Sequence, residues 1–393
     1  MRTQVGIIGA GPAGLLLAHL LTRRGIDCVV VENRSREYVE ARVRAGVLEQ
    51  GTVDLLREAG LGERLDREGL RHEGIYLQWP GERQRIDFEA LVGKSVWVYG
   101  QTEVVKDLIA ARVASGAPLL FEVSQTQVAG LDTDRPSLSC VDSTGTRRTW
   151  ECDAIVGADG FHGISRPAVP AQQQRTWERT YPYAWLGILA DVAPSTDELI
   201  YAWHPHGFAM HSMRSPHVSR LYLQVDLDER LEDWSDDRIW DELAHRLQLD
   251  GWALTPGPIT EKGITPMRSF VSSPMRHGRL FLAGDSAHIV PPTGAKGLNL
   301  AIADVALLAE ALVALTSRAE HALADDYSER ALRRVWRKTH FSWWMTSMLH
   351  TSGGPGPVDP FDAELQLAQL RYVCSSPAAA TTLAENYVGL PLS

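Results

Sequence analysis

The chain has 393 residues, of which 44% are hydrophobic and 22% are charged, and its formal net charge is −10. These proportions are typical of a globular protein with two or three domains, and the negative charge disfavours nucleic acids and anionic membrane surfaces as partners. We expect no signal peptide and no apolar run of about 20 residues that would span a bilayer. Four scattered cysteines predict neither a disulfide framework nor a metal site, so we expect a cytoplasmic protein.

The chain opens with a strand–helix–strand pattern over residues 4–32 that contains the motif Gly9-x-Gly11-x-x-Gly14. The first glycine of such a motif allows a tight turn, the second allows close approach of a pyrophosphate, and the third allows the helix to pack on the strand. Glu32 ends the second strand, where a carboxylate accepts hydrogen bonds from ribose hydroxyls. This region therefore predicts a dinucleotide site rather than a merely structural turn.

Two further glycine turns follow apolar runs later in the chain, at Gly157-Ala158-Asp159-Gly160 and at Gly284-Asp285. Three such turns describe one site that is assembled from distant segments and is suited to a flavin dinucleotide. Glycines before a long apolar helix expose N–H groups that stabilise negative charge at the pyrimidine end of a reduced flavin. We assign this role to Gly297, Leu298 and Asn299.

The order of elements predicts an α/β protein with a Rossmann-like FAD-binding domain, an antiparallel-sheet substrate domain and a helical C-terminal region. Residues 1–180 form the first domain, from which 73–96 join the substrate sheet. Residues 181–267 show the alternation of an antiparallel sheet. Residues 268–350 return to the FAD domain and include a long helix, and 351–393 form the C-terminal helical region.

Polar side chains share one face of two neighbouring strands in the substrate sheet. Ser212 and Arg214 alternate along the first strand, and Arg220 and Tyr222 along the second. A turn centred on His217 places Arg214 opposite Arg220 and Ser212 opposite Tyr222. Two facing arginines are unfavourable unless an anion lies near them, so the pattern predicts a carboxylate site. A solvated sheet face is the competing interpretation.

Several motifs together resemble those of the class A flavoprotein aromatic hydroxylases. They extend over nearly the whole chain and include, besides the glycine turns, Arg44–Gly51, Tyr99–Glu103, Asp159–Arg166, Ala287–Asn299, Phe341–Thr346 and Ala384–Pro391. The resemblance implies hydroxylation of 4-hydroxybenzoate at C3 to 3,4-dihydroxybenzoate, with NAD(P)H and O2, through a C4a-hydroperoxyflavin. It also implies a homodimer.

The resemblance implies roles for individual residues. Tyr201 is expected to hydrogen-bond the substrate phenol, Tyr387 to continue a proton relay, and His72 to form its outer end. The carbonyl of Pro292 is expected to meet the substrate hydroxyl and ring. Ser212, Arg214 and Tyr222 are expected to hold the carboxylate, with Arg220 near the flavin.

The remaining implied residues bind the cofactor or the electron donor. Those assigned to FAD are Arg42, Arg44, Gln101, Asp159 and Asp285, and those assigned to NAD(P)H are Arg34, Tyr38, Arg44, His162, Arg166 and Arg268. No arginine directly follows Glu32, and Glu37 and Glu40 add negative charge, so either NADPH or NADH is expected as donor. The substrate sheet departs from the family pattern at Trp203, His206, His211 and Met213.

Two alternatives stay open. One is a related hydroxylase that acts on another ring acid, such as 3-hydroxybenzoate or a salicylate. The other is a flavin-binding protein that does not hydroxylate.

Overall fold

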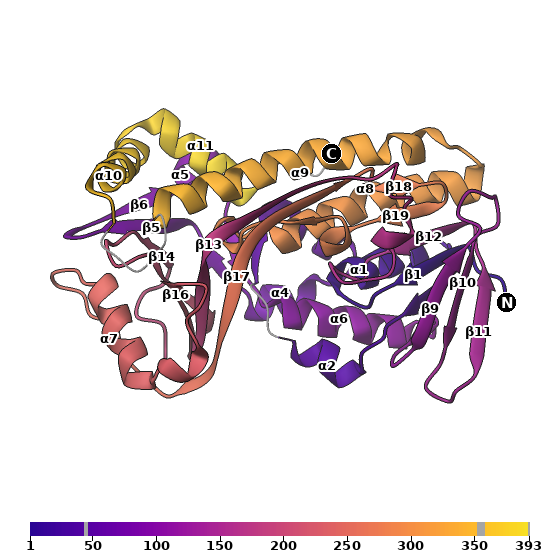
Figure 1. Ribbon diagram of the computed structural model, residues 1–393, viewed down its shortest axis with the longest axis horizontal. Coiled ribbons are helices and arrows are strands. Elements are labelled where there is room, and N and C mark those ends of the chain that lie inside the picture. Colours follow the sequence, from indigo (N-terminus) through magenta and orange to yellow (C-terminus); the bar gives the residue numbers. More distant parts are fainter. Residues whose placement is uncertain (43–45, 352–357, 392–393) are drawn as a thin grey trace.

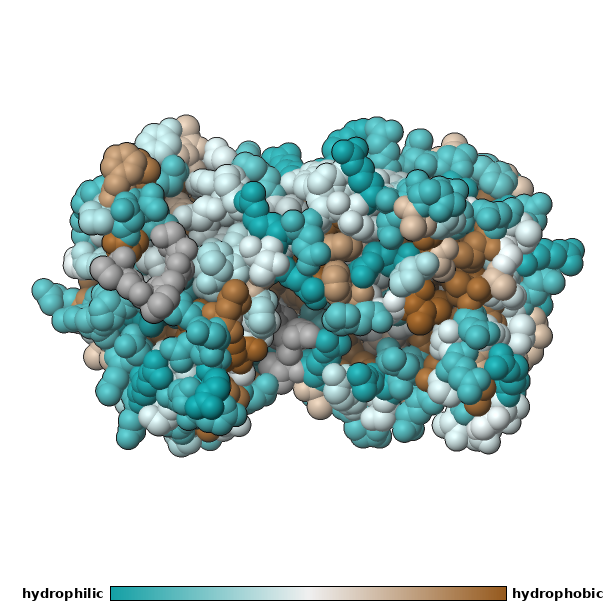
Figure 2. Space-filling model, viewed as in Figure 1, coloured by the Kyte–Doolittle hydropathy of each residue, from teal (hydrophilic) through white to brown (hydrophobic). Residues whose placement is uncertain are grey.

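The computed structural model describes residues 1–42, 46–351 and 358–391. It is a mixed α/β protein with two lobes, crossed by long strands and by a long helix (Figure 1). One lobe is built on a six-stranded sheet and the other on an eight-stranded sheet. The face in Figure 2 carries mainly hydrophilic side chains with scattered hydrophobic patches.

The six-stranded sheet forms the centre of the N-terminal lobe. Its first two strands and the strand at the second glycine turn are buried at every residue, as expected for parallel strands covered on both faces. The helix after the first glycine turn packs in the same apolar core. In spatial order the strands are β18 (Arg276–His277), β19 (Leu280–Leu282), β12 (Ala154–Gly157), β1 (Val5–Ile8), β2 (Cys28–Val31) and β8 (Leu119–Leu120).

The eight-stranded sheet forms the second lobe. Its longest strands, β13 and β17, run from one lobe to the other, and the segment from 74 to 87 contributes two strands at one edge (Figure 1). In spatial order the strands are β20 (His288–Ile289), β17 (Ile259–Ser273), β13 (Arg175–Ala190), β16 (Val218–Val225), β15 (Ala209–Ser215), β14 (Leu199–Ala202), β5 (Gly74–Trp79) and β6 (Glu82–Asp87).

The strands not yet described form two small antiparallel sheets. One consists of β11 (Arg147–Glu151), β10 (Ser137–Val141) and β9 (Ser124–Ala129), and the other of β3 (Val47–Glu49), β7 (Val96–Val98) and β4 (Leu70–His72). β3 pairs with β7, and Val47 and Val98 of these strands line a cavity at the junction of the two lobes.

The helices cover both lobes. They are α1 (Pro12–Thr22), α2 (Arg36–Ala41), α3 (Gln50–Glu58), α4 (Gly62–Glu68), α5 (Phe88–Val92), α6 (Gln101–Ala114), α7 (Asp236–Arg246), α8 (Gly297–Arg318), α9 (Ala322–Leu349), α10 (Pro360–Ser375) and α11 (Pro377–Val388). In Figure 1, α9 extends along one side of the molecule from one lobe to the other, and α10 and α11 cover the substrate lobe.

Helix α8 corrects one sequence expectation. It has 22 residues and is long and apolar enough to cross a membrane by composition, although no such run was expected. In the structure 78% of its most apolar window is buried, and its side chains belong to the core of the N-terminal lobe. Burial within the fold accounts for its apolar composition.

Candidate active site

The first glycine turn has the backbone that a bound pyrophosphate needs. Gly9 has φ of +108°, and a side chain at Gly14 would overlap with the carbonyl of Gly9, so these positions need glycine. A Cβ at Gly11 would meet nothing within 4 Å, which leaves open space in front of α1. No side chain caps α1, so its first N–H groups are available to phosphate oxygens. These features fit the diphosphate of FAD.

Glu32 closes this turn from the end of β2. Its Oε2 accepts a hydrogen bond from the N–H of Ala10 at 2.8 Å, and its Oε1 accepts one from the N–H of Arg34 at 2.9 Å. The carboxylate is thus fixed beside the glycine turn, and its remaining lone pairs are available to ribose hydroxyls.

The second glycine turn is held together by Asp159. Its Oδ2 accepts from the N–H and the hydroxyl of Ser165, at 3.0 and 2.9 Å, and a side chain at Gly163 would overlap with the carboxylate. Its buried Oδ1 has no partner among the described residues. Asp159 therefore shapes the turn and still offers one free oxygen.

The third glycine turn rests on a buried ion pair that sequence reasoning missed. Asp304 of α8 accepts from the N–H of Gly284 at 2.9 Å, and the same oxygen lies 2.6 Å from Nε2 of His288. Burial alone lowers the pKa of His288, but the negative charge of Asp304 outweighs it and raises the pKa. With Gly284 so fixed, Asp285 is presented at the surface of the turn and is exposed. The only available signal was an aspartate within an otherwise apolar helix.

The start of α8 presents uncapped backbone N–H groups over Gly297, Leu298 and Asn299. The side chain of Asn299 is occupied within the protein: its Oδ1 accepts from Glu49 N and Thr52 Oγ1 at 2.9 and 2.8 Å. Asn299 therefore fixes the turn with its amide and offers only its backbone to a ligand.

The substrate hairpin has a different register from the expected one. Ser212 lies opposite Arg220 and Met210 lies opposite Tyr222, whereas we expected Arg214 opposite Arg220 and Ser212 opposite Tyr222. The hairpin closes at the pair formed by Ser215 and Val218, and the register shifts between residues 213 and 215. This tighter turn moves the pairing by two residues, which keeps the polar side chains on their expected face.

These side chains line a cavity at the junction of the two lobes. Tyr201, Met210 and Tyr222 lie side by side across β14, β15 and β16. Arg214 lies four residues further along β15, on the order of 13 Å of strand from that row. Other residues that line the cavity are Gly46, Val47, Val98, Trp185, Leu199, Ser212, Met213, Arg220, Pro292 and Ala295.

Tyr201 lines one end of the cavity, and its hydroxyl is paired with that of Tyr387. The hydroxyl oxygens of Tyr201 and Tyr387 are 2.6 Å apart, and each side chain is 1% exposed. Either hydroxyl can be the donor. Burial, together with the neighbouring Tyr387, raises the pKa of Tyr201 well above its ordinary value. The predicted contact between two residues 186 positions apart is thus present in the fold.

The other end is cationic. Nη2 of Arg214 donates to Thr102 Oγ1 at the start of α6, and Nε of Arg220 donates to the hydroxyl of Tyr222. Any side chain at Gly100 would overlap with the guanidinium of Arg214, so glycine at this position leaves the space that Arg214 occupies. Burial, and next the charge of Arg220, lower the pKa of Arg214. Neither arginine forms an ion pair within the described residues, so this end suits an anion.

The two other residues expected to take part in catalysis, Pro292 and His72, form no hydrogen bond with the tyrosine pair in the described part of the chain. Pro292 lines the cavity, and its carbonyl accepts from the N–H of Ala295 at 2.8 Å. His72 is 1% exposed, and neither ring nitrogen has a partner among the described residues. Burial lowers the pKa of His72 to about 4, so the ring is neutral at pH 7.

An ionic cluster behind Tyr387 was not predicted. Oε1 of Glu49 accepts from Nζ of Lys296 at 2.7 Å and from Nζ of Lys338 at 2.6 Å, and Lys296 also donates to the backbone carbonyl of Tyr387 at 2.7 Å. Burial lowers the pKa of Lys296 to about 7, with Lys338 adding to the effect. Burial alone raises the pKa of Glu49, but the two lysines outweigh it and lower the pKa. Glu49 and Lys296 lie within the quoted motifs, which was the available signal.

Three of the residues assigned to NAD(P)H lie together. The guanidinium of Arg268 lies 3.7 Å from the ring centre of Phe161, that of Arg166 lies 4.4 Å from it, and His162 contacts the same ring. Arg34 instead stacks over Tyr38, at 5.1 Å. Arg42 is exposed after α2, Gln101 begins α6, and Arg44 lies outside the described residues.

Comparisons with known proteins show the family of the chain. A family model described as FAD binding domain matches residues 2–342. The chain is 50% identical to p-hydroxybenzoate hydroxylase of Acinetobacter baylyi, over 100% of this chain and 96% of the relative. It is 25% identical to 3-amino-4-hydroxybenzoate 2-monooxygenase of Streptomyces cremeus, over 91% and 90%.

The fold also matches a solved structure. The p-nitrophenol 4-monooxygenase of Pseudomonas putida superposes with a TM-score of 0.82 at 18% identity and covers 99% of this chain and 98% of its own. Together with the match to the family model and the 50% identity over the full chain, these findings show that the chain belongs to the class A flavoprotein aromatic hydroxylases, with FAD as its cofactor.

Proposed function

We propose that the chain hydroxylates 4-hydroxybenzoate at C3 to give 3,4-dihydroxybenzoate, with NAD(P)H as electron donor and O2 as oxidant. The observation that carries the proposal is the polarity of one cavity. The hydroxyl of Tyr201, which is hydrogen-bonded to that of Tyr387, lies at one end, and the guanidinium groups of Arg214 and Arg220 lie at the other. A para-hydroxylated benzoate has the matching ends. The relative at 50% identity supports the same substrate.

The cationic end holds the substrate carboxylate. A carboxylate accepts two parallel N–H bonds from Arg214, and the hydroxyls of Ser212 and Tyr222 complete its hydrogen bonds. The positive end of α6 adds to the attraction, since Arg214 reaches Thr102 in its first turn. This end sets the orientation of the ring along the strands, with the phenol directed to Tyr201.

The hydroxyl end removes the phenol proton. Tyr201 accepts it while passing its own proton to Tyr387 across the 2.6 Å contact, and Tyr387 passes its own proton on toward the outer end of the relay, so that neither tyrosine ends ionised. The phenolate ring is richer in electrons than the phenol and so more reactive to an electrophilic oxygen. We assign the outer end of this relay to His72, whose neutral ring has an available lone pair.

FAD, when bound, supplies the redox chemistry: it takes electrons from NAD(P)H and, once reduced, activates O2 for transfer of one oxygen atom. The chain excludes water from this step with the apolar walls of the cavity, which include Trp185, Leu199 and Met210. We assign the donor's phosphates to His162, Arg166 and Arg268, whose side chains gather around Phe161.

The test is an assay of NADH and NADPH oxidation with and without 4-hydroxybenzoate, with the product identified by chromatography. We expect oxidation to accelerate when the substrate is added and 3,4-dihydroxybenzoate to accumulate. Slow oxidation that is unaffected by the substrate and yields only hydrogen peroxide would indicate a flavin protein that does not hydroxylate. Acceleration by 3-hydroxybenzoate or salicylate alone would indicate a different ring acid.

We further propose that the enzyme is a cytoplasmic homodimer. All four cysteines are free thiols in the structure, which is consistent with a reducing compartment. Apolar side chains at Phe361, Leu365 and Tyr372 of α10 are exposed by 72%, 55% and 57%, which offers a surface for self-association. Sedimentation analysis at several concentrations tests the dimer, and a monomer at all concentrations would contradict it.

A further inference from the structure

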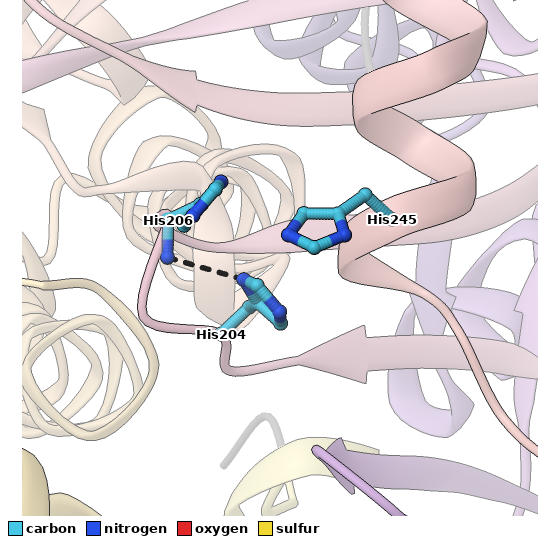
Figure 3. Close-up of side chains that lie close together, drawn as sticks. All are labelled: His204, His206 and His245. Carbon is cyan, nitrogen blue, oxygen red and sulfur yellow. Dashed lines mark hydrogen bonds between the residues drawn. The ribbon is translucent and has the colours of Figure 1, made fainter.

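Three histidine rings meet on the substrate lobe, away from the residues assigned to catalysis. His204 and His206 lie on the loop between β14 and β15, and His245 lies near the end of α7 (Figure 3). One ring nitrogen from each can be chosen so that all three lie within 4.8 Å of one another. His206 and His245 are exposed, and His204 is half-buried. Nothing in the proposed reaction uses these rings.

The three rings are arranged around a common point rather than stacked as a hydrophobic cluster. Their centres are 4.6 to 5.2 Å apart, and the planes of each pair are inclined by 54° to 81°. In a tetrahedral zinc site with bonds of about 2.0 Å, two ligand nitrogens lie about 3.3 Å apart. The rings therefore need to close by on the order of 1.5 Å, which rotation of the two exposed side chains can supply.

One ring nitrogen of His204 is already suited to a metal ion. The backbone N–H of His206 donates to Nδ1 of His204 at 3.1 Å, so this nitrogen carries a lone pair. A cation that binds Nδ1 therefore competes with this one hydrogen bond.

The positive charge next to His245 in the sequence is partly compensated. Arg246 follows His245, but its Nε donates to Glu242 at 2.9 Å, and its Nη1 donates to the carbonyl of Gln224 at 2.8 Å. Its charge is therefore partly neutralised by a carboxylate on the same helix. We propose that His204, His206 and His245 form a binding site for one divalent cation of the zinc class, with water as the fourth ligand.

The site would join two elements that the hydrogen bonds already bring close. The loop that contains His204 and His206 connects the strand of Tyr201 to the strand of Ser212, and His245 belongs to the helix packed beside them. A bound ion would fasten this loop to α7 and stabilise the substrate lobe. The described side chains supply three imidazole ligands and leave one position to water. The expected ion is therefore one that prefers imidazole nitrogen, as Zn²⁺ does.

The experiment uses the intact flavin-loaded enzyme, stripped of metal and then titrated with ZnCl2. We expect one equivalent of Zn²⁺ to be retained per chain after equilibrium dialysis, and the midpoint temperature of unfolding to rise until that equivalent is bound. A chain that retains no zinc, or whose unfolding midpoint is insensitive to zinc, overturns the proposal.

Matched variants locate the binding. His206→Ala and His245→Ala each remove one exposed ligand, and we expect the retained zinc and the temperature shift to be lost while flavin content and turnover without zinc stay unchanged. His321→Ala, which removes an exposed histidine elsewhere, should retain both. Zinc binding that survives in the His206→Ala and His245→Ala variants, or is lost equally in His321→Ala, would place the ion at another site and contradict the proposal.

Discussion

Tyr387 belongs to two buried polar networks that differ in charge. Through its hydroxyl it contacts Tyr201, and this pair is uncharged, with either oxygen able to donate. Through its carbonyl it accepts from Lys296, which with Lys338 surrounds the carboxylate of Glu49. One residue thus connects a network that can move a proton to a network of fixed charges.

The difference separates two tasks that a buried active site must perform. A proton moves easily between partners of similar acidity, which two neighbouring tyrosines provide. Position is held best by charge-assisted bonds, which Lys296 makes to the backbone of Tyr387 and to Glu49. We therefore expect changes in the tyrosine pair to affect turnover, and changes in the ionic cluster to affect stability.

The largest expected effect is on turnover. Tyr201→Phe should lower kcat for hydroxylation by about 10²- to 10⁴-fold, because the phenol loses its proton acceptor. The free energy of unfolding should fall by only about 1 kcal/mol, the contribution of one hydrogen bond. Steady-state assay with product analysis and urea denaturation measure the two. Tyr76→Phe, at a half-buried tyrosine of β5 that does not line the cavity, is the control. A Tyr201→Phe enzyme with normal kcat would remove the relay from the mechanism.

The ionic cluster should give the opposite result. Glu49→Gln leaves two buried ammonium groups without a counter-ion and should lower the free energy of unfolding by about 3 to 5 kcal/mol. Adding Lys338→Met should restore part of that loss, because it removes one of the two charges. Urea denaturation of both variants, with the exposed Glu58→Gln as control, gives the comparison. If Glu49→Gln is as stable as Glu58→Gln, the cluster does not hold the fold.

The pH dependence of stability sharpens the contrast further. The pKa of Lys296 is lowered from its ordinary value of 10.5 to about 7 in the folded protein. Between these values the unfolded chain binds more protons, so stability rises with pH across this window and falls toward pH 7. We expect a gain of about 1 to 2 kcal/mol between pH 7 and 8.5 that is reduced in Lys296→Met. Equal gains in both proteins would show that Lys296 does not titrate there.

The flavin cradle was largely predictable because each glycine turn carries its own local pattern. Gly9, Gly11 and Gly14 have the conformations and open space that their spacing indicates. The contacts by which other segments hold these glycine turns were not predicted. Asp304 lies 20 residues beyond the turn that it fastens, and no local pattern shows that a helical aspartate turns toward it.

The substrate cavity was predictable in its faces but not in its register. Alternation along a strand places Ser212 and Arg214 on one side whatever the turn, whereas the pairing depends on where the hairpin closes. Gly100 leaves space for Arg214, and Thr102 accepts a hydrogen bond from it. Both residues belong to the other lobe. Contacts between distant segments follow from packing, and their residue types alone do not reveal them.

Unlike the ionic cluster, the cationic end of the cavity has no counter-ion among the described residues, and changing it is expected to have the smallest effect. Arg214→Lys keeps the charge but loses the paired N–H groups that match a carboxylate. We expect the Kd for 4-hydroxybenzoate to rise about tenfold, equal to about 1.4 kcal/mol, with kcat at saturation nearly unchanged. Flavin fluorescence during substrate titration measures the Kd, and Arg179→Lys on the exposed part of β13 is the control. Unchanged affinity in Arg214→Lys would mean that the carboxylate binds elsewhere. The cavity would then have lost the polarity that orients its substrate.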